Sequence, residues 1–308
     1  MNIIGHRVVF YVISGIAVLV SLGALIVFGL PLGRDFTGGS LVELRYEGER
    51  PSTGAIDEIL ITQGFPKALV QPTGSDGFII RFPSLSEKEH KMIVKALGVV
   101  ESKTEETATS TTSTPAAFEE RFDSIGPVIG EELKRNALIA LTAAVAGIVL
   151  YIAWAFRKIS KPLSSWKYGV VAIVALMHDT IIPTGIFAAL GHWYGVEIDM
   201  LFVTALLTIL GFSVHDTIVV FDRVREHLRR GGEENFSSLV NQSVNETLAR
   251  SLNTSLTVVF VLGAVLFFGG SSTFYFVLAL LIGVVVGTYS SIFIASPLLV
   301  TIERWRRK

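Results

Sequence analysis

The chain has 308 residues, of which 50% are hydrophobic, and its mean hydropathy is +0.56, values typical of an integral membrane protein. The formal net charge of −1 gives no global field that would favour binding to nucleic acid. The absence of cysteine excludes disulfides, thiol nucleophiles and cysteine-ligated metal sites.

Six apolar runs are long enough, or nearly so, to cross about 30 Å of hydrocarbon. The first is too long for a typical signal peptide and lacks a clear cleavage site, so we interpret it as a retained membrane anchor. The fifth is the shortest and is polar at its start. The runs are Val8–Leu30, Ala137–Phe156, Tyr168–Leu190, Met200–Phe221, Leu252–Phe268 and Phe274–Val300.

The charges between these runs predict how the chain crosses a membrane. Lys and Arg gather in the connection 157–167, in the predicted cytoplasmic loop 222–250 and in the basic tail 301–308, and they are absent from 191–199 and 269–273. Because positively charged loops stay in the cytoplasm, both termini are predicted to be cytoplasmic. We therefore divide the chain into a first transmembrane helix (1–30), an extracytoplasmic domain (31–136), a five-helix transmembrane bundle (137–300) and the tail.

The segment 31–136 has the pattern of a small α+β domain. Its elements are expected in the order βαββαβ, which indicates a ferredoxin-like fold. Ser86 and Glu89 are spaced as a capping box at the start of the second helix. The Ser- and Thr-rich stretch 101–116 cannot bury apolar area and is expected to be a flexible loop. The expected elements are Ser40–Tyr46, Thr53–Gln63, Ala68–Gln71, Gly77–Phe82, a helix from Ser86 and Ala117–Phe122.

Within 222–250, apolar residues fall on one helical face. A helix with such a face lies in the membrane interface, against a partner, or against its own bundle. The residues are Phe236, Leu239, Val240, Val244 and Leu248.

Asp216 lies inside the fourth apolar run, where a carboxylate costs about 2.5–3.5 kcal/mol or more. It stands seven residues before Arg223, about 10 Å inside the cytoplasmic end of its helix. Arg250 is expected to open the fifth helix from the same side, so that its long side chain could reach the acid. Such a pair would be a proton-coupling element, in which Arg250 stabilises the ionised acid and is released on protonation; the alternative is a static ion pair.

A second acid, Asp179, is expected near the middle of the third helix, and both acids occur in the triplet His-Asp-Thr. His215 and Thr217 flank Asp216, so these two residues and Asp179 are accessory candidates. We interpret the repeated triplet as partly coincidental, because the two helices run in opposite directions. Each histidine lies about 100° around its helix from the acid, which favours packing over proton relay.

The remaining signals concern packing and the absence of known motifs. Gly283 and Gly287 have the spacing that lets membrane helices approach closely. We find no P-loop, no dinucleotide-binding fingerprint and no metal-binding cluster in the sequence. The chain is therefore predicted not to be an enzyme and to use no cofactor other than a transported ion, a proton or sodium.

Several segments together resemble the SecF family. These are Asp35-Phe36-Thr37-Gly38-Gly39 after the first helix, Ile125–Leu133, Gly211–Glu226, Glu246–Ser255 and Gly287–Pro297. They follow the order of the family over nearly the whole chain. Two departures are His215, where the family often has Asn, and the Ser/Thr-rich outer loop.

The resemblance implies a multi-pass subunit in the bacterial plasma membrane, related to resistance-nodulation-division (RND) transporters. It implies a role in Sec-dependent protein translocation and release, driven by the proton motive force, with Asp216 and Arg250 as the membrane acid and its partner. A further acid would come from SecD, expected here as a separate chain. The other implied partners are the SecYEG translocon, YajC, the unfolded exported polypeptide and membrane lipid.

Two other functions remain open. A proton-driven RND exporter of lipid or small molecules usually has a larger, duplicated outer domain than this chain provides. A scaffold would use Asp216 and Arg250 only as a strut. The glycines of Asp35–Gly39 suit a tight turn into the first strand, and we hypothesise that this segment couples the first helix to movement of the outer domain.

Overall fold

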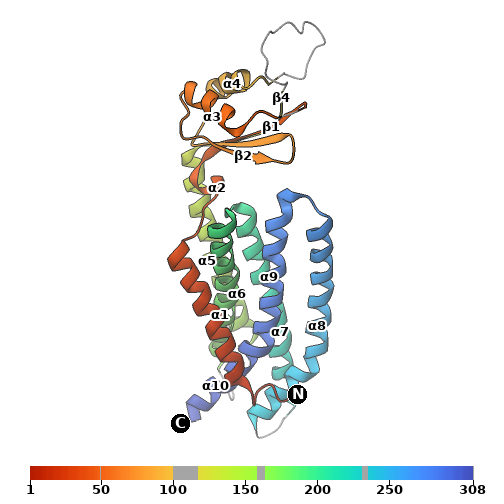
Figure 1. Ribbon diagram of the computed structural model, residues 1–308. Helices are drawn as coiled ribbons and strands as arrows, with labels where there is room; N and C mark the ends of the chain where they lie inside the picture. Colours follow the sequence, from red (N-terminus) through yellow and green to blue (C-terminus); the bar gives the residue numbers. More distant parts are fainter. Residues whose placement is uncertain (49, 100–116, 158–163, 231–234, 308) are drawn as a thin grey trace. The chain divides into compact units, whose positions relative to one another are not determined.

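The structure is a computed structural model that describes residues 1–48, 50–99, 117–157, 164–230 and 235–307. The chain forms two compact units (Figure 1). One unit comprises Leu32–Asn136, and the other comprises Met1–Pro31 with Ala137–Lys308. The predicted flexible loop 101–116 lies outside the described residues.

The first unit is an antiparallel sheet with two longer helices. Its strands are β1 (Gly39–Tyr46), β2 (Leu69–Thr73), β3 (Gly77–Phe82) and β4 (Ala117–Ile125). The sheet order is β2-β3-β1-β4, and β1 pairs antiparallel with both β3 and β4. With helices α3 (Thr53–Thr62) and α4 (Glu87–Ala96), this is the ferredoxin-like arrangement that the sequence predicts.

Alternation along the strands places the core of this unit on one face of the sheet. Val42 and Leu44 of β1 and Phe78 and Ile80 of β3 are fully buried, together with Ile56 of α3. At the start of α4, Ser86 accepts a hydrogen bond from the Glu89 backbone, and the Glu89 side chain accepts one from the Ser86 backbone. The predicted capping box is therefore confirmed.

The second unit contains the membrane helices. Within the part of the chain that the structure describes, six helices are long and apolar enough to cross a bilayer, as the sequence predicts. Because Pro is well tolerated in the first turn of a helix, α5 begins at Pro127 rather than at 137. The helices are α1 (Arg7–Phe28), α5 (Pro127–Ala155), α6 (Ser165–Tyr194), α7 (Met200–Arg229), α8 (Phe236–Phe268) and α9 (Phe274–Ser290), the last continued by a π-helical turn (Ser291–Ala295) and α10 (Ser296–Arg307).

The connection predicted at 222–250 is largely helical in the structure, and the helix expected at 236–248 is part of α8. α7 continues to Arg229 and α8 already begins at Phe236. The apolar face of 236–248 packs against the bundle itself, because Phe236, Val240 and Val244 are buried in its core. The tail is not a separate segment either, because α10 extends through it to Arg307.

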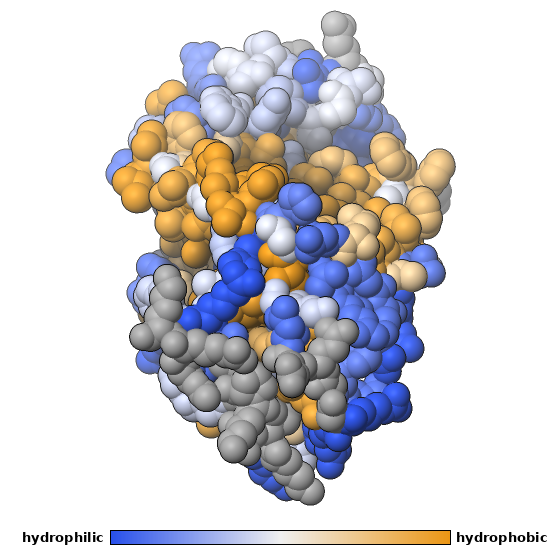
Figure 2. All heavy atoms as spheres, turned by 90° about the horizontal axis from the view of Figure 1, so that it is seen from below, coloured by the Kyte–Doolittle hydropathy of each residue, from blue (hydrophilic) through white to orange (hydrophobic). Residues whose placement is uncertain are grey.

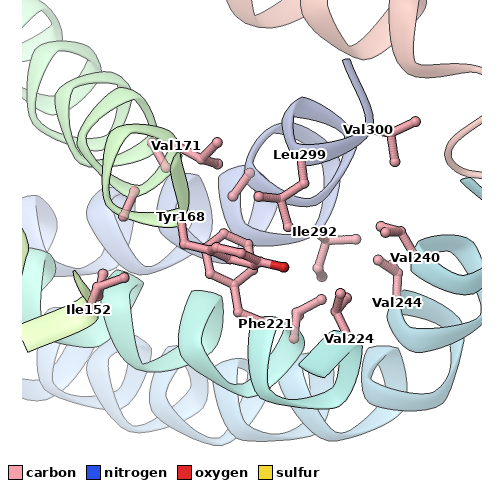
Figure 3. Packing of buried hydrophobic residues seen from close by; sticks show 14 of the residues in the cluster. Ile152, Tyr168, Val171, Phe221, Val224, Val240, Val244, Ile292, Leu299 and Val300 are labelled. Carbon is pink, nitrogen blue, oxygen red and sulfur yellow. The ribbon is translucent and has the colours of Figure 1, made fainter. Parts of the chain in front are cut away.

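Aromatic packing fills the core of this unit near the ends of α5, α6 and α7. The ring of Tyr168 stacks on Phe156 at 5.2 Å and meets Phe221 edge-on at 5.3 Å. Figure 3 shows Tyr168 and Phe221 with Ile292 and Leu299 beside them. Through these contacts the π-helical turn and α10 pack against α6 and α7.

Besides the core, the outer surface of the helical unit also has exposed apolar side chains, among them Ile16, Leu150 and Phe260. This is expected for a protein surrounded by lipid. Both termini lie at one end of this unit (Figure 1). Viewed from that end, hydrophilic side chains gather near the viewer, and hydrophobic ones lie farther along the helices (Figure 2).

Candidate ion-coupling site in the membrane helices

Close packing of α7 against α9 defines the centre of the candidate site. A Cβ added to Gly283 would lie 2.1 Å from Ile209 Cδ1, and one added to Gly287 would lie 3.0 Å from Ser213 Cβ. The two glycines therefore let α9 approach α7 as small residues do in membrane proteins. This approach brings hydroxyl side chains of both helices toward the two membrane acids.

Asp216 is buried on α7 and has only 2% of its surface exposed. Within the described residues, its Oδ2 atom has no hydrogen-bond partner. Its Oδ1 atom lies 3.8 Å from Nδ1 of His215, whose side chain is 68% exposed. Ser255 of α8 also faces this carboxylate. Both oxygen atoms of a buried carboxylate normally accept hydrogen bonds, so Asp216, with one oxygen that accepts none among the described residues, is unusual inside the bundle.

The predicted pair between Asp216 and Arg250 is not formed. Among the ion pairs of the described residues, none joins these two side chains within 4.0 Å. Since α8 begins fourteen residues earlier than Arg250, Arg250 does not open a helix as predicted, and it is exposed.

Arg250 instead lines a cavity of about 320 Å³ between α7 and α8. On the α7 side this cavity begins at Val219, one turn after Asp216. Its other charges are already engaged, because Arg223 makes ion pairs with both Glu226 and Glu246. Arg250 is thus a cation near Asp216 in the fold and without an ion pair to it.

Asp179 has the opposite environment, because it is fully buried and fully bonded. His178 lies beside it, with Nδ1 2.8 Å from Oδ1. Ser213 of α7 and Ser290 of α9 donate their hydroxyls to Oδ2, Ser290 at 2.7 Å. The carboxylate therefore joins three helices, α6, α7 and α9.

Further hydroxyl contacts surround the two acids. Thr217, predicted as an accessory residue, shares a hydrogen bond of 2.9 Å with Ser291. Ser255 and Thr288 share one of 2.6 Å between α8 and α9. The π-helical turn follows directly after Ser290, and such turns often occur where a helix is adapted to function.

Sequence reasoning missed the roles of Ser213, Ser290 and Ser255 as partners of the acids. Their signal was present, because Ser213 precedes Asp216 by about one helical turn and Ser290-Ser291 interrupts an apolar run. His178 does pack, stacking with Tyr289 at 6.2 Å, and it also contacts the acid.

Residues 35–39 lie in the α+β unit. Arg34–Thr37 form the short helix α2, and Phe36 is buried. Gly38 and Gly39 have φ angles of +71° and +133°, which favour glycine. A Cβ would lie 2.9 Å from Pro127 Cα at position 38 and 2.8 Å from the Phe82 carbonyl oxygen at position 39. The segment thus makes a tight turn with close backbone packing.

The chain matches two family models. One is the SecD/SecF protein export membrane protein, C-terminal, over residues 104–305, and the other is the SecD/SecF GG motif, over residues 23–49. Among curated proteins, it is 44% identical to the protein translocase subunit SecF of Thermobaculum terrenum, covering 98% of this chain and 94% of that protein. It is 37% identical to SecF of Anaerolinea thermophila over 99% of this chain and 96% of the relative.

The fold also matches a solved structure. The crystal structure of SecDF, a translocon-associated membrane protein from Thermus thermophilus, superposes with a TM-score of 0.79 at 32% identity. The match covers 100% of this chain and 39% of the SecDF chain, so this chain spans well under half of that protein. Six spans, the βαββαβ domain and both family models agree, and the chain belongs to the SecF family of protein translocase subunits.

Proposed function

We propose that this subunit, together with a separate SecD chain, uses the proton motive force to promote Sec-dependent translocation of unfolded polypeptides and their release outside the membrane. The observation that carries the proposal is Asp216, a carboxylate buried among membrane helices with Oδ2 unpaired within the described residues. Such a group is costly in the membrane interior, and where it occurs it usually marks an ion or proton path. The match to 39% of a SecDF chain supports a partner that supplies the remainder.

In this mechanism, Asp216 alternates between a neutral and an ionised form. The neutral form suits the buried position, because it leaves no net charge in the bundle. The ionised form would require a cation, and Arg250 is suitably placed, because its cavity begins one turn from Asp216. Binding of Arg250 would then draw α8 toward α7, which couples the proton to helix movement.

We place the working assembly in the bacterial plasma membrane, with both termini in the cytoplasm and the α+β unit outside. SecYEG and YajC are the further partners that we propose, beside lipid. Coupling to sodium instead of the proton can be tested by measuring export of a secreted precursor after the proton gradient has been collapsed and a sodium gradient has been imposed.

The first test measures export of a secreted precursor in cells depleted of this protein and rescued with wild type or Asp216→Asn. We expect Asp216→Asn to co-purify with SecD and to lower export at least tenfold, because Asn cannot release a proton. Asp222→Asn, at a side chain that lines the same cavity but is 66% exposed, is the matched control and should restore export. Full export by Asp216→Asn would show that the acid is structural.

A further inference from the structure

Asp179 is an acid that the proposed Asp216 mechanism does not use. It has 0% of its surface exposed, and His178 has 6%. The other residues that bond to its carboxylate, Ser213 and Ser290, have 0% exposure as well. A carboxylate placed this deeply is tolerated only when it is neutral or when a positive partner and hydrogen-bond donors stabilise it.

The charged and titratable groups around Asp179 are few. His178 is the neighbour on α6. On α7 the nearest groups in sequence to Ser213 are His215 and Asp216, and the further charges begin at Asp222, nine residues or about 14 Å after Ser213. The packed helices α1 and α9 carry no charged side chain beyond Arg7, and Tyr289 is the titratable residue of α9 near His178. On α10 the charges begin at Glu303, thirteen residues or about 20 Å after Ser290. Among the described residues, His178 is therefore the base in contact with Asp179.

We call His178 and Asp179 the dyad. With a neutral imidazole and an ionised carboxylate the dyad has a net charge of −1, so one added proton makes it electrically neutral. In one form the proton sits on Asp179 Oδ1 and is donated to His178 Nδ1. In the other it sits on Nδ1 of an imidazolium and is donated to a carboxylate. Removing the proton would leave a buried negative charge, and adding one would leave a buried positive charge.

Ser290 connects the position of the proton to the position of α9. Its hydroxyl donates to Oδ2 and therefore favours the ionised carboxylate. Ser290 is the last residue before the π-helical turn, and the adjacent Ser291 bonds to Thr217 and to the Ser213 carbonyl oxygen of α7. Displacement of α9 would move the Ser290 hydroxyl away from Asp179 and would also change the contacts of Ser291 with α7.

We propose that Asp179 and His178 form a second proton-binding site of the bundle, which exchanges its proton as α9 moves relative to α6 and α7. The role of the site in the export cycle rests on the proposed function. The proton-binding site itself can be tested without export.

The experiment is an infrared pH titration of the full chain reconstituted in lipid vesicles, following both the stretch of protonated carboxyl groups and the ring vibrations of imidazolium, because the proton sits on either Asp179 or His178. We expect a titrating band that is absent from Asp179→Asn and present in Asp216→Asn. Thr184→Val is the matched control, because the Thr184 hydroxyl bonds to the Thr180 carbonyl oxygen of its own helix; its spectrum should keep the band. Spectra in which neither a carboxyl band nor an imidazolium band depends on Asp179 would overturn the proposal.

Two further measurements cover the other outcomes. If Asp179→Asn does not fold, Ser290→Ala serves instead, and we expect it to shift the titration of the band; an unchanged titration overturns the proposal. In the export assay, Asp179→Asn should co-purify with SecD and lower export at least tenfold; full export would overturn the role of the site in the export cycle, whereas the infrared titration decides the proton-binding site itself. Full export by Asp216→Asn instead contradicts the proposed function, while the infrared result for Asp179 stands separately.

Discussion

At the scale of single residues, the same triplet has two different environments. His178-Asp179-Thr180 lies where α1, α7 and α9 all pack on α6, so both His178 and Asp179 are buried. His215 of the second triplet is 68% exposed, while Asp216 beside it is buried. The sequence analysis favoured Asp216 over Asp179 as the ion-coupling acid, but only the neighbours distinguish the bonded carboxylate of Asp179 from that of Asp216, which has an unpaired oxygen within the described residues.

Tyr46 of β1 offers a residue-scale test of an unpaired polar group. Its hydroxyl is buried and has no hydrogen-bond partner within the described residues. Burial raises the pKa of Tyr46 to about 12. Because this value lies above the ordinary 10.0, the folded unit disfavours the ionised phenol. Ionisation of Tyr46 therefore takes nothing from the stability below pH 10, and stability falls as the pH rises from 10 toward about 12.

We therefore expect Tyr46→Phe to raise the free energy of unfolding by about 1 kcal/mol at neutral pH, and to reduce the loss of stability between pH 10 and 12. The measurement is guanidinium unfolding of the full protein, reported by a fluorophore on Asp57→Cys of α3. Tyr194→Phe, at a side chain that is 74% exposed, is the control and should change neither quantity. A less stable Tyr46→Phe protein would show that the hydroxyl has a partner.

At the scale of elements, the interface between α7 and α9 depends on glycine. We expect Gly283→Ala to destabilise the bundle by about 1–3 kcal/mol, because its Cβ would overlap Ile209. The measurement is the thermal unfolding midpoint of the full chain in detergent. Gly263→Ala is the control, since nothing lies within 4 Å of that position.

Ile209→Ala should restore part of the stability lost in Gly283→Ala, because it removes the atoms that overlap. An unchanged midpoint for Gly283→Ala alone would mean that α7 and α9 are farther apart than this structure shows.

The turn at Gly38 and Gly39 is a second element-scale feature. Gly38→Ala and Gly39→Ala should each destabilise the α+β unit by about 1–3 kcal/mol, because both positions have positive φ and face backbone atoms. Hydrogen exchange of β1 in the full protein measures this loss. Gly54→Ala in α3 meets nothing within 4 Å and should leave β1 protection unchanged.

These variants also test the hypothesis that residues 35–39 couple the first helix to the outer domain. A coupling role predicts that export falls while β1 protection and SecD binding remain. Loss of β1 protection in proportion to loss of export would instead assign the segment a local structural role.

At the scale of the whole molecule, the charge pattern predicts the direction of insertion. Because the chain contains no cysteine, single-cysteine variants can be labelled without background. A membrane-impermeant maleimide should label Ser272→Cys in intact spheroplasts and Trp305→Cys only after permeabilisation. The reverse pattern would place both termini outside and would contradict the proposed orientation.

The sequence by itself determined the six spans, the βαββαβ order, the capping box of α4 and the presence of Asp216 within the membrane. These features depend on local periodicity, length and hydropathy, which a single segment carries. The boundaries at 222–250 could not be predicted, because helices α7 and α8 are polar there and gain stability from packing on the bundle.

Only the tertiary structure decided which side chains meet. Asp179 is bonded by residues 34 and 111 positions away in the sequence, whereas the expected pair of Asp216 and Arg250 is not formed. Periodicity places a residue on a face of its helix. The rotation and separation of neighbouring helices, set here by Gly283 and Gly287 against α7, then determine which faces come together.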